Sequence, residues 1–503
     1  MKKSQNFTLR LCLFSLLPSK YRITIVFLLL AKVVFSQELE DRIEEVENGL
    51  TLQMTLPAEK EITRKSILQR LQESKIHGAS IAVINDGKIE WSKTYGIKEV
   101  GKPDPVTTET LFQCASIGKV ITSLAVLKLV EGGKIDLDED VNNKLKRWKI
   151  EENKITKIKK VTPRHLLSHS AGLTDGYGFL GYDPNGEIPT LLQILNNEAP
   201  AKAKKSLAIK TEPGTIERYS GAGYLILQLL IEDVSGLSYE DYVQQHIFDS
   251  LGMIHSTYDH RPDEDLEMTV ASGHLSNGKP LKKKKYHVYP EKGAAGPWTT
   301  AEDLAKLIIG VQKSINGDPN SILKKETTLK LLTRQINNKG LGVNLKGIEK
   351  PEAFWHAGQN LGYMGVLYGL IDERKGAVIL INSDGGERII QEFITSVAHA
   401  YDWPIMKSYT ALNIPMDLQS DIAGAYESDD KAQRLSIEMN NNMLYVKSEG
   451  SKKGYQLYRI EDNRYTFKNA QDYYMLSFNF KNDQIILTYA ESIGKVVELK
   501  KVK

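Results

Sequence analysis

Cysteine is scarce in this chain of 503 residues, which contains only Cys12 and Cys114. Cys12 lies in an amino-terminal segment that we expect to be removed from the mature protein. Cys114 would then be the one remaining thiol, which excludes an intramolecular disulfide. A tetrahedral metal site built on several cysteines is excluded for the same reason. A large exported protein folds without disulfides, because its core is big enough to stabilise it.

Long hydrophobic runs are also lacking. An apolar run over residues 23–35 follows Lys20 and Arg22 and is interrupted by Lys32. It is shorter than the span of about 20 residues that crosses a bilayer comfortably. A basic segment followed by a short apolar run is typical of a secretory signal. We therefore expect a signal peptide over residues 1–36 and a protein exported to the periplasm or secreted. The alternative is an uncleaved signal anchor, which would be the chain's membrane contact.

The chain has no excess of basic residues outside this leader. Residues 1–36 contain six basic residues and no acidic ones, and the rest of the chain carries 60 basic and 63 acidic residues, a net charge of −3. A basic face is the electrostatic footprint of nucleic-acid binding. Composition therefore predicts no nucleic-acid partner.

Two hydrolase signatures are missing as well. The chain has no G-x-S-x-G motif, which argues against the nucleophile elbow of α/β hydrolases. His165 and His169 are four residues apart without the glutamate that zinc hydrolases place between them. We expect both to be buried structural histidines. Cys114 is expected to pack into a wall rather than act as a nucleophile, and no metal or cofactor is expected.

Residues 37–410 mix strand and helix patterns, whereas residues 416–503 have strand patterns alone. In the first segment we expect a hairpin over 81–91, helices over 116–130 and 224–234, and a buried strand over 376–382. Residues 174–215 are predicted to form a long irregular loop, and loops of this length often act as lids over active sites. From residue 422 onward, short alternating runs separated by turns predict about eight strands in a small antiparallel barrel.

The most informative motif is Ser116-Ile-Gly-Lys119 at the start of a predicted helix. Residues three apart lie on one helix face, one turn from each other. A serine hydroxyl is a weak nucleophile that needs an adjacent base, and a buried lysine amine can serve as that base. The amino end of a helix also offers N–H groups to an oxyanion. Taken alone, an S-x-x-K motif is common and weak.

Two later stretches add further candidates. Tyr219 precedes a glycine-rich turn and a helix, where its phenol could relay a proton. His356-Ala-Gly358 lies just before a predicted strand, and the missing Cβ of a glycine lets backbone approach a substrate closely. Taken alone, each stretch is more typical of a structural role, a packed tyrosine in the first and a structural histidine in the second.

Together and in this order, the three stretches resemble the motifs of the serine β-lactamase and penicillin-binding protein superfamily, in its class C-like branch. The resemblance covers about residues 70–400. Three accessory stretches of the sequence are similar to internal landmarks of that branch: TPRHLLSHSAGL at 162–173, LGMIHST at 251–257 and AAGPWTTAEDL at 294–304.

The resemblance implies a role for each matching residue. Ser116 would be the acylated nucleophile, and Lys119 would either deprotonate it or keep its proton balance with Tyr219. His356 takes the first place of the K-T-G or H-x-G motif. The backbone N–H groups of Ser116 and of Gln359, which follows Gly358, would form the oxyanion hole.

The chain departs from the β-lactamase pattern at two places. Many β-lactamases of the family have asparagine two residues after the tyrosine, where this chain has Gly221, and a lysine where it has His356. Gly221 offers no side-chain amide to an acylamino substrate, and His356 replaces the lysine that helps to hold a β-lactam carboxylate. Both changes favour peptidase or esterase chemistry over β-lactam hydrolysis.

The resemblance implies an α+β fold, with an antiparallel sheet flanked by helices and an all-helical subdomain. We expect this serine hydrolase domain over residues 37–410 and a lipocalin-like barrel over 416–503. The expected function is an exported serine hydrolase of the DD-peptidase, D-aminopeptidase or esterase type. Its substrate would be a small molecule or peptide, including one derived from the cell wall. The alternatives are a catalytically silent envelope-binding protein or a β-lactamase.

Overall fold

The computed structural model describes most of the chain beyond the leader. The expected signal peptide at 1–36 lies outside the described residues. Those residues are 37–52, 54–55, 64–174, 179–202, 207–259, 268–281, 284–347, 350–406, 409–429, 433–449, 451, 453–461, 464–468, 473–481, 484–490 and 496–502. None of the helices in these ranges is long and apolar enough to cross a membrane.

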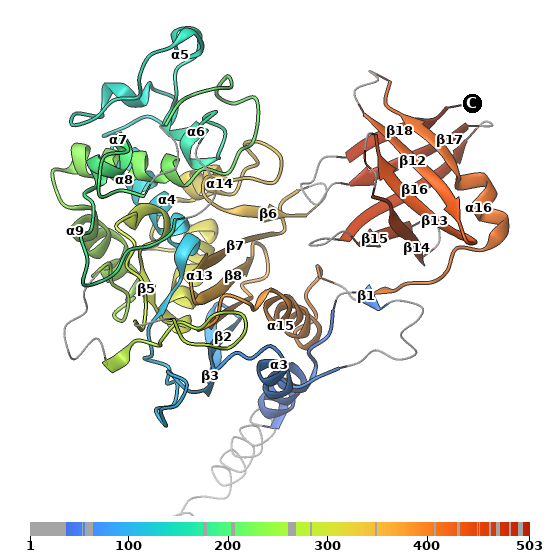
Figure 1. The fold of residues 1–503 in the computed structure, drawn as a ribbon, viewed down its shortest axis with the longest axis horizontal. Coiled ribbons are helices and arrows are strands. Elements are labelled where there is room, and N and C mark those ends of the chain that lie inside the picture. The colour runs from blue at the N-terminus through green and yellow to red at the C-terminus, as the bar shows by residue number, and fades with distance from the viewer. Residues whose placement is uncertain are drawn as a thin grey trace, which may run out of the picture.

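A six-stranded antiparallel sheet forms the centre of the larger part of the molecule (Figure 1), in the order β3-β2-β9-β8-β7-β6. Asp86 and Gly87 link β2 to β3, both with positive φ, as a two-residue hairpin turn requires. The sheet strands are β2 (Gly78–Asn85), β3 (Lys88–Gly96), β6 (Asn344–Lys346), β7 (Ala353–Asn360), β8 (Tyr363–Leu370) and β9 (Gly376–Ile381).

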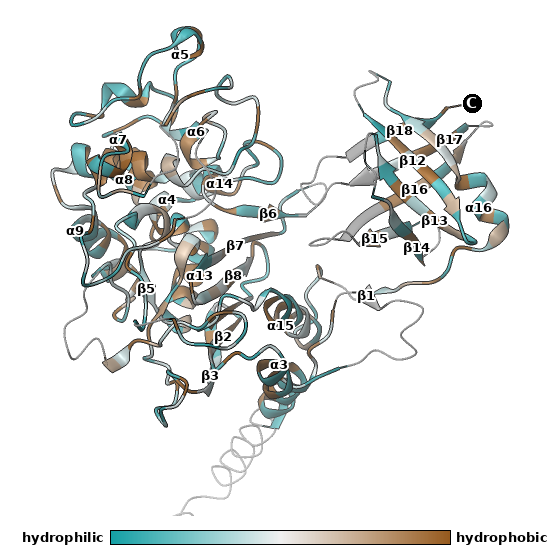
Figure 2. Cartoon of the chain, viewed as in Figure 1, coloured by the Kyte–Doolittle hydropathy of each residue, from teal (hydrophilic) through white to brown (hydrophobic). Residues whose placement is uncertain are grey.

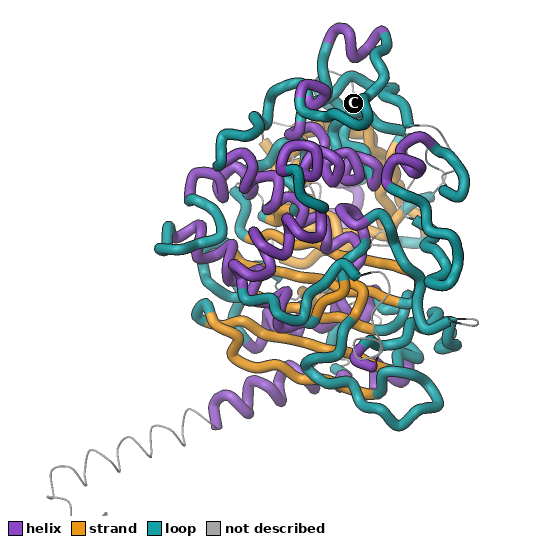
Figure 3. The backbone as a smooth tube through the Cα atoms, turned by 90° about the vertical axis from the view of Figure 1, so that its left-hand side faces the viewer, coloured by secondary structure: helices purple, strands orange, loops and turns teal. Residues whose placement is uncertain are grey.

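Helices cover both faces of this sheet. Successive strand residues point to opposite faces, so Ala82 and Ile84 join the core beneath α13 (Ala301–Asn316), whereas Ile81 and Val83 join a second core. That second core is closed by α3 (Ile67–Glu73) and α15 (Glu387–Ala400). Figure 3 shows the strands layered among helices.

A helical subdomain packs beside the sheet around α4 (Gly118–Glu131) and α8 (Gly221–Ser235). Most residues of both helices are buried, as expected for helices in the interior of a large protein, and α8 is strongly hydrophobic in Figure 2. The remaining helices of this part are α5 (Lys154–Ile158), α6 (Pro163–Leu167), α7 (Leu191–Asn196), α9 (Tyr239–Val243), α10 (Asp249–Leu251), α12 (Lys292–Ala295) and α14 (Lys325–Leu331).

The predicted hairpin, the two predicted helices and the predicted buried strand agree with the structure apart from their ends. The expected helix at 116–130 is α4 (Gly118–Glu131), preceded by a tighter 3₁₀ turn, and the expected helix at 224–234 is α8 (Gly221–Ser235). The loop at 174–215 is less irregular than predicted, because Thr190 caps α7 inside it.

A closed barrel of eight antiparallel strands follows, which confirms the predicted architecture. Alternate residues fill its interior with apolar side chains, including the rings of Tyr426, Tyr465 and Phe478. Eight strands enclose a space that side chains can fill. The boundaries at 410 and 416 and the lipocalin likeness stay predictions. The strands are β11 (Gly424–Glu427), β12 (Arg434–Asn440), β13 (Met443–Ser448), β14 (Tyr455–Glu461), β15 (Arg464–Lys468), β16 (Tyr473–Lys481), β17 (Gln484–Ala490) and β18 (Val496–Lys501), and α16 (Met416–Ile422) precedes them.

Candidate active site

Ser116 lies in a 3₁₀ turn, Ala115–Ile117, that leads directly into α4. Ala115 has a φ of +49°, in the left-handed region that residues other than glycine rarely adopt. Strain of this kind costs about 1–3 kcal/mol and collects at functional sites. The backbone before the turn is anchored, because the N–H of Cys114 donates to the carbonyl of Pro297 at 3.2 Å. The turn thus holds Ser116 at the amino end of α4.

Lys119 lies beside Ser116 and is 1% exposed. Its Nζ is 3.0 Å from the Oγ of Ser116 and donates to the carbonyl oxygen of Ala294 at 2.7 Å. The same Nζ is 5.0 Å from the ring centre of Tyr219 and 5.5 Å from that of Tyr224. The carbonyl of Ala294 gives the buried Nζ the hydrogen-bond partner that a buried polar group needs. The amine is therefore fixed within hydrogen-bond reach of the serine.

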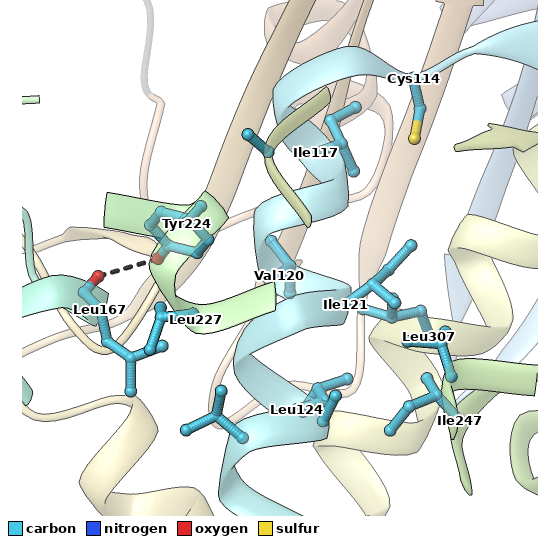
Figure 4. Close-up of a cluster of buried hydrophobic side chains, with 14 of the residues drawn as sticks. Cys114, Ile117, Val120, Ile121, Leu124, Leu167, Tyr224, Leu227, Ile247 and Leu307 are labelled. Carbon is cyan, nitrogen blue, oxygen red and sulfur yellow. Dashed lines mark hydrogen bonds between the residues drawn. The ribbon is translucent and has the colours of Figure 1, made fainter. Parts of the chain in front are cut away.

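A packed hydrophobic core lies beneath this pair. Apolar side chains of α4, among them Val120, Ile121 and Leu124, pack into the core shown in Figure 4. The hydroxyl of Tyr224 donates to the carbonyl of Leu167 at 2.9 Å, which joins α8 to the end of α6. Close packing of this kind keeps side chains in single rotamers.

The short helix α12 contributes backbone acceptors that the sequence analysis did not identify. The carbonyl of Ala294 binds Lys119, and the next carbonyl, that of Ala295, accepts from Nδ2 of Asn360 at 3.1 Å. Asn360 also donates to Oε1 of Gln113 at 2.9 Å. Every residue has a backbone carbonyl, so the sequence signals these acceptors only indirectly. The small residues of α12 allow Lys119 and Asn360 to approach its backbone closely.

Tyr219 is positioned by His169. The two rings stack with their centres 4.3 Å apart, and Nδ1 of His169 accepts from the N–H of Ser220 at 3.1 Å. Burial, followed by the charges of Lys339 and Lys119, lowers the pKa of His169 well below 6.5. The ring is therefore neutral with its proton on Nε2. This contact confirms that His169 is a buried structural histidine satisfying loop backbone.

His356 lies within β7, rather than ahead of a strand as predicted, and its side chain is buried. Its Nδ1 lies 2.7 Å from the carbonyl of Ala357. A carbonyl only accepts, so Nδ1 carries the proton and Nε2 is free to accept. Burial, together with the nearby charge of Lys119, lowers the pKa of His356 to about 3. At neutral pH this imidazole is therefore an uncharged acceptor.

Gly358 brings β7 against the serine turn. A Cβ at this residue would lie 3.0 Å from the N of Ser116 and closer still to the carbonyl oxygen of Cys114. Strand β6 pairs with β7 only as far as Trp355 among the described residues. Beyond Trp355, this edge of β7 therefore lies against the 3₁₀ turn that contains Ser116, not against another strand. Glycine is required here because any side chain would separate the two.

The structure also places the other two predicted residues. Gln359 is exposed, and its Nε2 donates to the carbonyl of Asp384 at 3.1 Å. Gly221 is the first residue of α8, and a Cβ there would lie 2.6 Å from Cζ of Phe179. The side-chain position at 221 is thus taken by an aromatic ring.

The described residues contain no group of three or more His, Cys, Asp or Glu side chains that could hold a metal ion. Burial raises the pKa of the Cys114 thiol to about 12. A cysteine reacts as its thiolate, so Cys114 is not a nucleophile at neutral pH. Ser116 is the nucleophile candidate that has an adjacent amine.

Comparison with known proteins agrees with this geometry. The family model described as Beta-lactamase matches residues 63–398, more than half of the chain. Penicillin-binding protein 4* of Bacillus subtilis (strain 168) is 25% identical over 409 residues, covering 77% of this chain and 87% of that protein. Protein flp of Staphylococcus aureus (strain MW2) is 29% identical over 188 residues, 37% of this chain and 36% of flp.

Solved structures share the fold. The octameric penicillin-binding protein homologue from Pyrococcus abyssi has a TM-score of 0.57 at 23% identity and covers 86% of this chain and 98% of its own. A penicillin-binding protein from Bacillus halodurans has a TM-score of 0.53 at 22% identity, covering 66% of this chain and 98% of its own. The chain belongs to the β-lactamase family, within the superfamily of serine β-lactamases and penicillin-binding proteins.

Proposed function

We propose that this protein is an exported serine hydrolase that forms an acyl-enzyme on Ser116 and acts on peptide-like amides or esters. The observation that carries the proposal is the 3.0 Å contact between Ser116 Oγ and the buried Nζ of Lys119. A hydroxyl and an amine at this distance satisfy the geometric requirement for an activated nucleophile.

In the acylation step, the Lys119 amine in its uncharged form accepts the hydroxyl proton while Oγ of Ser116 forms a bond to the substrate carbonyl carbon. The negative charge then resides on the carbonyl oxygen, which the N–H groups of Ser116 and Gln359 stabilise. Collapse of this intermediate breaks the bond to the leaving nitrogen or oxygen, which takes its proton by way of Tyr219. Water then attacks the acyl-enzyme, releasing the acid and restoring the serine.

Two features favour a peptidase or esterase over a β-lactamase. His356 is uncharged at neutral pH and cannot form an ion pair with a substrate carboxylate. Gly221 provides no amide for an acylamino group. DD-peptidase, D-aminopeptidase and carboxylesterase activities are therefore the proposed types, with a small-molecule or peptide substrate, including one from the cell wall. A periplasmic or secreted location follows from the proposed leader.

A fluorophosphonate probe tests the proposal directly. The probe should label Ser116 in the full-length protein, as mapped by peptide mass spectrometry, and Ser116→Ala should abolish labelling. Ser250→Ala, an exposed serine in α10, is the matched control and should be labelled like the wild type. Labelling that persists on another residue in Ser116→Ala would refute the assignment.

The second candidate is a catalytically silent envelope-binding protein, motivated by the changed residues at 221 and 356. It predicts ligand binding without turnover, unchanged by Ser116→Ala. The two candidates are separated by a substrate panel of D-Ala-D-Ala peptides, D-aminoacyl amides, short-chain esters and nitrocefin. Turnover of any of these compounds that is lost in Ser116→Ala contradicts the hypothesis of a catalytically silent protein.

A further inference from the structure

The backbone around Ser220 directs residue 221 toward the Ser-Lys pair. Ser220 has φ −134° and ψ 118°, an extended conformation, in which residues on either side of it point in the same direction. Its own hydroxyl points the other way and accepts from the N–H of Gly223 at 2.9 Å. Tyr219 faces Lys119, with the ring centre 5.0 Å from Nζ. A side chain at Gly221 would therefore lie on the same side as Tyr219.

The ring of Phe179 occupies that place. Its Cζ and Cε2 atoms would be 2.6 Å and 2.9 Å from a Cβ on Gly221. The ring is partly buried and packs against the main hydrophobic core. Its segment is held in place at Tyr182, whose N–H donates to the carbonyl of Val288 at 2.8 Å and whose carbonyl accepts from the N–H of Val288 at 2.9 Å. Phe179 and Gly221 are therefore complementary in shape.

The side-chain amide of Gln113, just before the serine turn, binds two protein partners. Its Oε1 accepts from Asn360 at 2.9 Å, and its Nε2 donates to the carbonyl of His287 at 2.6 Å. The ring of Phe179 and the hydrogen of Gly221 offer no side-chain hydrogen-bonding group, so a substrate amide placed against them would lose bonds to water without gaining one from either side chain. Burying a polar group without a partner is unfavourable, whereas burying an apolar chain is favourable.

We propose that Phe179 is a specificity-determining residue that forms an apolar wall beside Tyr219 and selects substrates with an apolar acyl chain over those with an acylamino group. The inference rests on the proposed acyl-enzyme function and narrows its substrate class. The acyl residue of a D-Ala-D-Ala peptide carries an acylamino group, so the apolar wall favours the esterase type over the DD-peptidase type. Phe179 acts on the side chain of the acyl group and not on the reacting atoms, so acylation of Ser116 itself does not require it.

Two thioesters with the same thiol leaving group test this proposal. Pentanoyl and N-acetylglycyl thioesters have acyl chains of equal length, and only the second carries an amide. Hydrolysis breaks the C–S bond and releases the thiol, which is measured with a chromogenic disulfide. We expect the wild type to prefer the pentanoyl thioester by about 10-fold or more in kcat/KM, the scale of discrimination by an apolar pocket.

The double variant Phe179→Ala with Gly221→Asn removes the ring and supplies an amide in the space it leaves. We expect it to lower the preference for the pentanoyl chain by about 10-fold. Phe179→Leu retains an apolar wall and should retain most of the preference. Leu180→Ala is the matched control, because Leu180 is the adjacent residue and is 57% exposed. It should behave like the wild type.

A double variant that keeps the wild-type ratio within twofold would overturn the proposal, as would a wild type without preference. Thermal melting checks that each variant is folded. If the double variant does not fold, the single variant Phe179→Ala is used in its place. An unchanged ratio of kcat/KM for the two thioesters in that variant would overturn the proposal. Fluorophosphonate labelling, run in parallel, distinguishes failure of this proposal from failure of the proposed function. If Ser116 is labelled but the wild type hydrolyses both thioesters equally well, only the role of Phe179 is contradicted. If the wild type is neither labelled nor active, the proposed serine hydrolase function is contradicted.

Discussion

Gly358→Ala tests whether the approach of β7 to the serine turn positions the site. The new Cβ would lie 3.0 Å from the N of Ser116 and still closer to the carbonyl of Cys114. Both obstacles are backbone atoms, so no side-chain rotation relieves the overlap. The strand and the turn must move apart by about 1 Å, a misplacement that typically costs about 100-fold in rate. A 100-fold loss corresponds to about 2.7 kcal/mol of transition-state stabilisation.

The assay is the second-order rate of fluorophosphonate labelling, together with urea unfolding. We expect the labelling rate of Gly358→Ala to fall about 100-fold and the free energy of unfolding to fall by about 1–3 kcal/mol, as for other overpacked sites. Gly132→Ala is the matched control. Its Cβ would meet nothing nearer than the carbonyl of Lys128 at 3.4 Å, and its φ is −76°. A Gly358→Ala protein that is labelled at the wild-type rate would refute the reasoning.

Three further predictions concern the amine, the imidazole and the sheet-covering helices. Lys119→Met should slow fluorophosphonate labelling by about 10²–10⁴-fold, the contribution of a general base, and labelling at the wild-type rate would contradict that role. Because burial lowers the pKa of His356 to about 3, the unfolded chain binds its proton more readily, and stability is lost as the pH falls from about 6.5 toward 3. His356→Gln should make that loss shallower in thermal melts from pH 7 to 4, and identical slopes would contradict the burial of a neutral ring. Arg70 donates to the fully buried Glu392 at 2.5 and 2.7 Å, and Arg388 donates to the same carboxylate at 2.9 Å. Because Arg388 remains, Arg70→Met should cost about 2 kcal/mol in urea unfolding, the scale of lost hydrogen bonds to a charged group. Glu73→Gln, at the exposed partner of the same arginine, should leave the unfolding midpoint nearly unchanged.

Local patterns in the sequence determined several parts of this protein. The spacing of Ser116 and Lys119 at a helix start predicts their contact, because residues three apart on a helix are neighbours wherever that helix packs. The Asp86-Gly87 turn predicts the hairpin, since both residues tolerate positive φ. The alternating runs after residue 422 predict the barrel, because a strand with one buried face has a period of two. These features depend on neighbours in the chain.

Only the tertiary structure decided what surrounds the serine and lysine. The carbonyl of Ala294 that binds Lys119 is 175 residues away in sequence, and no side-chain pattern distinguishes one carbonyl from another. The stacking of His169 on Tyr219 and the insertion of Phe179 at Gly221 likewise join distant segments. Such contacts arise from the packing of whole elements, so their partners cannot be derived from the periodicity of either segment alone.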